Sequence, residues 1–349
     1  MTMQVTLLDV ARLASVSAKT VSRVVNNQGE ISEATRQRVQ EAIEQLGYRP
    51  NMLARSLVSQ RSHTLAVVTS GLEYFGPSHT LTGIEQKSYD LGYTLMFSLL
   101  AHSDDTNVLP ILDSFTARQV DGIIWAVSEI GDNRSWIRPE LLKNLPPVVF
   151  LTMKPMDGLS VVSVNNRSGA IQATEHLIDQ GRRKIGLISG PMAWWESRER
   201  FAGYKEAMAK AGLEAAPSQI VEGDWTAQSG KHGMQRLMQQ RPDLDAVFAC
   251  NDQMALGALG VAHQTGRKVP QDIAFVGFDN IPEAACFWPP LTTVDQHLSD
   301  VGCLSVQILQ KLIEARQQGQ EDRSTEVKIL EPELFTRESS TGIPAGVNA

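Results

Sequence analysis

Residues 6–26 read TLLDVARLASVSAKTVSRVVN, which is two short helical patterns separated by a break at 14–16. Thr6 and Asp9 have the spacing of a capping box, although Asp stands in place of the usual Glu or Gln. Apolar residues recur at helical spacing after Thr6, and Ser17 is suited to cap the second helix. The stretch therefore predicts two helices joined by a tight turn.

A third helical pattern follows between Ser32, which can cap its start, and Gly47, which can end it. Its inward positions repeat at i, i+4 and i+7 and are Val39, Ile43 and Leu46. Three short helices with a tight turn between the first two describe a helix-turn-helix over residues 1–50. The same pattern also fits an ordinary three-helix bundle.

The second helix carries polar side chains on the face opposite its valines. Its short hydroxyls and Asn26 suit phosphate contacts, and Arg23 can reach the acceptors of guanine. Residues 1–62 hold eight Arg and Lys against five Asp and Glu, a net charge of +3. Since the whole chain has a net charge of −7, the remaining residues have a net charge of −10. Because salt confines attraction to about 10 Å, a basic head on an acidic body favours local contact with DNA.

The sequence of this N-terminal region resembles the lactose-repressor/galactose-repressor family of bacterial transcription regulators. The matching positions are residues 6–11, 16–26, Ser32, Thr35-Arg36 and 47–51. The resemblance implies that Ala18, Lys19 and Arg23 read bases. It assigns DNA-backbone contacts to Thr6, Ser17, Thr20, Ser22, Asn26, Ser32, Thr35, Tyr48 and Asn51, with Leu7 beside them. The pair Ala18-Lys19 departs from the lactose repressor itself, so a different operator sequence is expected.

Residues 51–62 form the expected hinge. Pro50 ends the third helix, and the segment that follows is too short to be helical alone, since isolated helices under about 12 residues are marginal. In the resembling family, paired hinge helices fold in the minor groove and insert a leucine, which corresponds to Leu57 beside Ala54 and Arg55 here. A flexible linker is the alternative.

From Thr64 onward, apolar strand patterns alternate with helical ones. Strands are expected at 65–68, 94–98, 122–126, 148–151, 161–164, 184–188, 245–249, 272–276 and 334–340, and helices near 81–91, 108–119, 167–179 and 197–211. Apolar strands that alternate with helices indicate parallel sheets covered on both faces. The predicted fold is therefore an all-α helix-turn-helix head plus an α/β core of two doubly wound parallel-sheet subdomains, like a periplasmic binding protein. The first subdomain is expected to hold 63–163 and 296–325, the second 164–295 and 326–341, and 342–349 is a tail.

Polar motifs follow three of the predicted strands, at Gly190-Pro191, Cys250-Asn251-Asp252 and Gly277–Asn280. Ligands of doubly wound folds bind at such carboxyl ends of strands, and amides and carboxylates beside an aromatic plate suit a sugar. By itself, Asn251-Asp252 could equally be a turn cap.

Longer stretches of the core resemble the same family, at residues 189–191, 198–204, 222–226, 251–257, 276–280 and 289–294, so the resemblance spans 5–341. It implies that the effector cleft is lined by Arg200, Trp225, Asn251, Asp279 and Gln296, with Phe75 and Trp194 as further candidates. Trp125-Ala126 and Leu151-Thr152 are less polar than in the lactose repressor, and the loop 71–77 differs from the commoner Asn-Pro-Phe version. These departures indicate a sugar or glycoside with an apolar face.

The predicted function is a transcription regulator, by family default a repressor of a carbohydrate operon, whose operator affinity depends on a bound sugar. A homodimer on a pseudo-palindromic operator is expected. No leucine heptads follow Ser340, so the four-chain bundle of the lactose repressor is not expected.

Two other classes of protein fit this sequence less well. A solute-binding protein of the same core fold would need an export signal and would lack the helix-turn-helix. An enzyme is disfavoured because no Walker loop, dinucleotide fingerprint or Gly-x-Ser-x-Gly elbow occurs, so no catalytic residue, metal or cofactor is expected. The three cysteines are too scattered for a disulfide framework, and no apolar stretch approaches about 20 residues, which together favour the cytoplasm.

Overall fold

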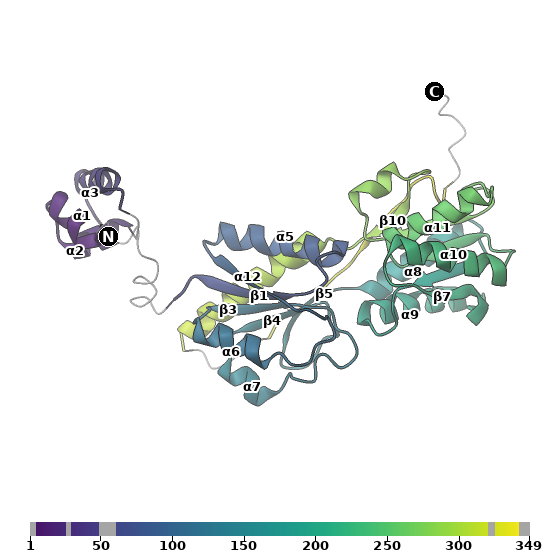
Figure 1. Cartoon of the computed structure of the whole chain (residues 1–349), viewed down its shortest axis with the longest axis horizontal. Coiled ribbons are helices and arrows are strands. Elements are labelled where there is room, and N and C mark those ends of the chain that lie inside the picture. The colour runs from purple at the N-terminus through teal and green to yellow at the C-terminus, as the bar shows by residue number, and fades with distance from the viewer. Residues whose placement is uncertain (1–4, 26–28, 49–60, 320–324, 342–349) are drawn as a thin grey trace, which may run out of the picture. The chain divides into compact units, whose positions relative to one another are not determined.

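The computed structural model describes residues 5–25, 29–48, 61–319 and 325–341 (Figure 1). The chain divides into two compact units, residues 1–62 and 63–349, called here the head and the core. Several expected features lie outside the described residues, namely Asn26, Asn51, Ala54, Arg55, Leu57, most of the hinge and the tail. In the part of the chain that is described, no helix has the length and apolarity to cross a membrane.

The head contains the three predicted helices, α1 (Leu7–Leu13), α2 (Ala18–Val25) and α3 (Glu33–Leu46). They close on one small core in which Val10, Val21 and Val39 are fully buried. At the start of α1, the Asp9 carboxylate accepts the Thr6 backbone N–H at 2.9 Å, which is half of the predicted capping box.

The other helix ends follow the expected chemistry in part. Ser17 Oγ accepts the Thr20 backbone N–H at 3.1 Å and so caps α2. Gly47 ends α3 with φ +60°, and the next N–H, that of Tyr48, reaches back to the Ile43 carbonyl at 3.0 Å. Ser32 stands at the start of α3, but its hydroxyl donates to Thr35 Oγ1 instead of capping the helix.

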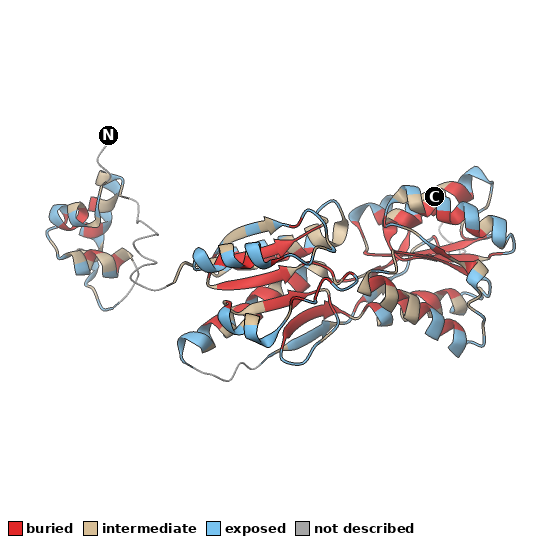
Figure 2. Cartoon of the chain, turned by 60° about the horizontal axis from the view of Figure 1, so that its bottom comes forward, coloured by how far each residue is buried: buried red, intermediate tan, exposed pale blue. Residues whose placement is uncertain are grey.

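The first subdomain of the core is built on a six-stranded parallel sheet with the order β11-β5-β4-β3-β1-β2. Its elements are β1 (Thr64–Thr69), α5 (Phe75–Asp90), β2 (Thr94–Leu99), α6 (Leu109–Ala117), β3 (Gly122–Ala126), α7 (Pro139–Asn144), β4 (Val148–Leu151), β5 (Ser160–Val164), α12 (Leu298–Gln317) and β11 (Val327–Leu330). Successive residues of β1 bury opposite faces: Leu65 and Val67 pack toward α5 and α12, whereas Ala66 and Val68 pack toward α6 and α7. The buried strands between helix layers are visible in Figure 2.

The second subdomain has a sheet of order β12-β10-β9-β8-β6-β7, which is parallel except where β12 pairs with β10. Its elements are α8 (Asn166–Asp179), β6 (Ile185–Ser189), α9 (Trp195–Lys210), β7 (Ile220–Glu222), α10 (Ala227–Gln240), β8 (Ala246–Ala249), α11 (Asp252–Gln264), β9 (Ala274–Phe278), β10 (Thr292–Asp295) and β12 (Glu333–Phe335). Helices α10 and α11 pack backbone to backbone, since a Cβ on Gly257 would lie 1.8 Å from the Ala227 carbonyl oxygen. Both predicted sheets are therefore present.

Three details of the predicted core were wrong. Strand β11 pairs with β5, so the last crossing between subdomains comes after Leu330 and not at residue 326. Helix α5 begins at Phe75, six residues early, because Pro77 is tolerated in a first helical turn. Strand β12 ends at Phe335, and beyond it Ser339 bonds Phe275 through both its side chain and its backbone carbonyl, outside a named strand.

Candidate ligand cavity and DNA-reading helix

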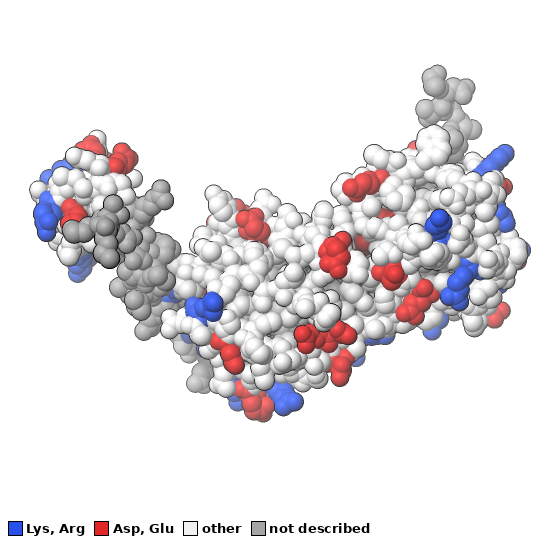
Figure 3. Space-filling model, viewed as in Figure 1, with Lys and Arg blue, Asp and Glu red and all other residues white. Residues whose placement is uncertain are grey.

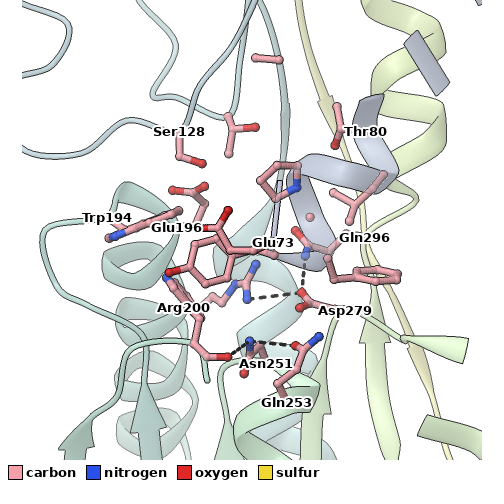
Figure 4. A pocket seen from close by; sticks show the side chains of 18 of the residues that line it. Glu73, Thr80, Ser128, Trp194, Glu196, Arg200, Asn251, Gln253, Asp279 and Gln296 are labelled. Carbon is pink, nitrogen blue, oxygen red and sulfur yellow. Dashed lines mark hydrogen bonds and ion pairs between the residues drawn. The ribbon is translucent and has the colours of Figure 1, made fainter. Parts of the chain in front are cut away.

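A cavity of about 340 Å³ lies in the core where the carboxyl ends of the strands of both subdomains meet (Figure 4). Its walls come from the β1–α5 loop, the ends of β3 and β4, the start of α9 and the ends of β8 and β9. The lining residues are Glu73, Tyr74, Phe75, Gly76, Pro77, Thr80, Ala126, Ser128, Thr152, Trp194, Glu196, Arg200, Trp225, Thr226, Asn251, Gln253, Asp279, Gln296 and Leu298. All seven residues expected to contact an effector are among them.

Arg200 of α9 is held at the base of the cavity by several groups at once. Its Nε donates to Asn166 Oδ1 at 2.8 Å, and Nη1 donates to the Cys250 carbonyl and lies 3.7 Å from Asp279 Oδ1. Its guanidinium stands 3.8 Å from the ring centroid of Phe278. With its side chain 6% exposed, Arg200 is a fixed charge.

Asp279, directly after β9, faces Arg200 and also accepts Gln296 Nε2 at 2.6 Å. Burial raises the pKa of Asp279 to about 6, although Arg200 and Gln296 oppose this shift. Its backbone φ is +113°, and two other cavity residues, Thr152 and Trp225, have φ of +53° and +73°. Such conformations are costly for residues other than glycine and gather at functional sites.

Of the neighbouring residues Asn251 and Asp252, the first lines the cavity and the second stabilises the surrounding structure. Asn251 Oδ1 caps α11 by accepting the Met254 N–H at 2.8 Å, and its Nδ2 donates to the Trp225 carbonyl at 2.9 Å. The neighbouring Asp252 is not among the lining residues, and its carboxylate accepts Thr293 Oγ1 at 2.6 Å. Thus Asn251 is both a helix cap and a lining residue.

Aromatic rings line the same cavity. Trp194 meets Tyr74 edge to face with centroids 6.0 Å apart, and meets Trp225 at 5.8 Å. Phe75 stacks on His79 at 3.8 Å. Fixed polar groups against an aromatic wall are the combination that binds the hydroxyls and the apolar face of a sugar ring.

The sequence patterns did not identify all of the lining residues. Glu73 and Tyr74 lie in the 71–77 loop, whose sequence departs from the commoner version and so does not mark them as lining residues. Glu196 and Ser128 lie in no motif that was singled out, although Trp194-Trp195 stands beside Glu196. Among the described residues, no cluster of His, Cys, Asp and Glu could hold a metal ion.

In the head, α2 buries Val21 and Val24 and turns its polar residues outward. Ser17, Lys19 and Arg23 are exposed, and Ala18, Thr20 and Ser22 are half-buried. The remaining described residues of the expected DNA contact are exposed at Thr6 and Ser32 and half-buried at Leu7, Thr35 and Tyr48. Figure 3 shows Lys and Arg gathered along one side of the head.

Two family models match parts of the chain. Residues 6–51 match the profile of bacterial regulatory proteins of the lacI family, and residues 174–340 match a periplasmic binding protein-like domain. The HTH-type transcriptional repressor PurR of Aliivibrio salmonicida is 35% identical, covering 96% of this chain and 98% of its own.

Solved structures extend the similarity to complexes with DNA and with ligand. A Lac repressor dimer bound to operator and the anti-inducer ONPF has a TM-score of 0.83 at 29% identity, covering 97% of this chain and 99% of the other. A complex of the transcriptional regulator CelR with cellobiose has a TM-score of 0.69 at 33% identity, covering 96% and 100%. Since the relatives are regulators over almost their whole length, the chain is a DNA-binding transcriptional regulator and not an enzyme, and it belongs to the LacI family.

Proposed function

We propose that this protein is a repressor whose affinity for its operator is set by a sugar or glycoside bound in the core cavity. The observation that carries the proposal is the convergence of Arg200, Asp279, Asn251 and Gln296 beneath the aromatic wall. Amide and carboxylate groups held in place by one another bind hydroxyls without having to reorganise. The ONPF and cellobiose complexes of the two similar structures agree with a glycoside ligand.

Helix α2 would make the contact with the DNA bases. Lys19 and Arg23 are exposed on a helix whose opposite face is buried, so their side chains can enter a major groove, with Ala18 beside them. The hydroxyls of Ser17, Thr20 and Ser22 would fix the helix on phosphates. The similar Lac repressor is a dimer on its operator, and we infer the same homodimeric arrangement here, acting in the cytoplasm where the DNA is.

Control of DNA binding would come from the two walls of the cavity. Arg200, Asn251 and Asp279 belong to the second subdomain, whereas Phe75 and Thr152 belong to the first. A ligand that touches both walls favours one angle between the subdomains, and it changes DNA affinity only by its preference between two such states, typically about 1–3 kcal/mol. The predicted hinge at 51–62, with Leu57 in the minor groove, would transmit the difference.

The test combines two measurements on the full chain. Monosaccharides and disaccharides are screened by thermal shift, and operator binding is then measured with and without each hit. We expect at least one sugar to raise the melting temperature and to change operator affinity by about 5- to 150-fold. The proposal fails if no sugar changes either quantity, or if the protein prefers no DNA sequence over random duplex.

A further inference from the structure

One end of the cavity holds groups that a single sugar ring on Arg200 and Asp279 would leave unused. Figure 4 shows Trp194, Glu196 and Ser128 on the side of the cavity away from Gln296 and Asp279. Trp194 and Glu196 stand at the start of α9, and Ser128 follows β3 in the other subdomain. We call this group, with Tyr74, the outer end.

The apolar surface is continuous between the two ends. Trp225, which closes over Arg200 with the guanidinium carbon 5.5 Å from its ring centroid, meets Trp194, and Trp194 in turn meets Tyr74. Successive centroids are 5.8 and 6.0 Å apart, and the rings meet edge to face at 73° and 88°, so the aromatic lining extends over more than the width of one pyranose ring. A ligand of one ring would leave part of this wall uncovered.

Glu196 supplies a polar group at the outer end. It is 6% exposed, and its Oε2 has no hydrogen-bond partner among the described residues. Ser128 lies against the carboxylate, and burial raises the pKa of Glu196 despite the nearby Arg200 and Arg134. A buried carboxylate oxygen without a donor costs free energy, and a ligand hydroxyl would remove that cost.

The charges of the cavity restrict the ligand further. The charged side chains among its lining residues are Glu73, Glu196, Asp279 and Arg200, three acids against one base. The guanidinium of Arg200 is already engaged by Asn166, Cys250 and Asp279. An anionic sugar would therefore meet net repulsion from the three acidic side chains.

We propose that the outer end is a second sugar subsite, and that the ligand is a neutral glycoside of two rings, one at Arg200 and Asp279 and the other packed on Trp194 and Tyr74 with its hydroxyls on Glu196. This rests on the proposed function, because it assigns the ligand class of the same cavity. Trp194 and Glu196 are then the residues that select a two-ring ligand over a one-ring ligand.

The test measures dissociation constants by calorimetry for neutral disaccharides (cellobiose, maltose, lactose, trehalose), for glucose and galactose, and for glucose 6-phosphate. We expect at least one disaccharide to bind more than about tenfold tighter than either monosaccharide, and glucose 6-phosphate to bind more weakly than glucose. Equal affinity for one and two rings, or tightest binding of the phosphate, overturns the subsite while leaving sugar control intact. If none of these sugars binds, the proposed function fails together with the subsite.

Two pairs of variants locate the effect. Trp194→Ala and Glu196→Gln should bring the ratio of disaccharide to monosaccharide affinity close to one. Their matched controls are Trp195→Ala, the adjacent tryptophan, and Glu199→Gln on the same helix, neither of which lines the cavity, and these should keep the ratio. Operator binding without sugar verifies that each variant is folded. An unchanged ratio in both test variants contradicts the assignment.

Discussion

The two functional surfaces of this regulator differ in what holds their side chains in place. On α2 of the head, Lys19 and Arg23 project into solvent, and the fold below them rests on Val21 and Val24. In the cavity, Arg200 is bonded to several neighbours and is almost completely buried. The side chains that would touch DNA thus contribute little to the stability of the fold, whereas those that would touch the ligand also stabilise it.

This difference predicts how substitutions behave. A change on the exposed face of α2 should alter binding alone, because surface substitutions away from special features usually stay within about 0.5 kcal/mol of the original stability. A change in the cavity network should alter binding and stability together, because it leaves buried polar groups without partners. The size of the expected effect on binding or stability decreases from the cavity network to the exposed end of α3.

Arg200→Ala should have the largest effect. It leaves the buried carboxylate of Asp279 without its cation, and breaking a buried pair in this way typically costs about 3–5 kcal/mol. We expect ligand affinity to fall more than about 100-fold and the melting temperature of the core to fall as well.

The matched control is Arg167→Ala, which breaks an ion pair with Glu206 that is about half exposed on each side. Calorimetry and thermal unfolding of this variant should stay close to the unmodified chain, since exposed pairs contribute little. If Arg200→Ala lost affinity without losing stability, the contrast between the two surfaces would be wrong.

Arg23→Ala should come next and should affect DNA binding only. A good arginine contact to a base discriminates by about 1–3 kcal/mol, so operator affinity is expected to fall about 30-fold at constant salt. Arg38→Ala, on the exposed side of α3, is the control and should change operator affinity far less. A lowered melting temperature for Arg23→Ala would show that α2 is not separable from its scaffold.

Much of the fold could be predicted from the sequence because its signals are local. Helix caps, the turn at 14–16 and the apolar strands each depend on a few adjacent residues, so β3 and β4 were placed at their observed bounds. Strand β11 could not be placed, since Val327 and Ile329 are exposed on an edge strand and carry no alternation of burial. Its sheet is decided by pairing with β5, which lies far away in the sequence.

The lining residues at the other end of the cavity, around Arg200 and Asp279, could also be predicted, but for another reason. Arg200, Asn251 and Asp279 stand in motifs that follow predicted strands or resemble a known family, whereas Glu196 does not. What makes Glu196 notable is its burial without a full set of partners, and burial depends on tertiary packing. The outer end therefore became apparent only in three dimensions.

The third prediction concerns pH and sharpens the role of Asp279. Its folded pKa of about 6 is above the ordinary 3.8, so its contribution to stability is complete below pH 4 and is lost as the pH rises through 6. Ligand binding should change in the opposite direction, because a ligand hydroxyl donates best to the ionised carboxylate. Affinity should rise about tenfold between pH 5 and pH 7.5, following the ionised fraction.

Calorimetry of Asp279→Asn tests this assignment, because the amide does not titrate. The variant should bind more weakly at pH 7.5 and should lose most of the pH dependence. If the variant keeps the full tenfold rise, then another group, such as Glu196 with its raised pKa, controls the titration.

Gly47→Ala should have the smallest effect. It tests whether the head unfolds independently of the core. A Cβ at this position would meet nothing within 4 Å, so the only cost is the φ of +60° that ends α3. That cost is about 1 kcal/mol for a residue with a side chain, so hydrogen exchange of the α3 amides should become about fivefold faster while exchange in the core does not change. The control is Glu44→Ala, an exposed position on the same helix, which should leave α3 exchange the same or slower, because alanine favours helix. Faster exchange in the core strands of Gly47→Ala would mean that the two units unfold together, and that the DNA-reading surface depends on the ligand cavity even for its stability.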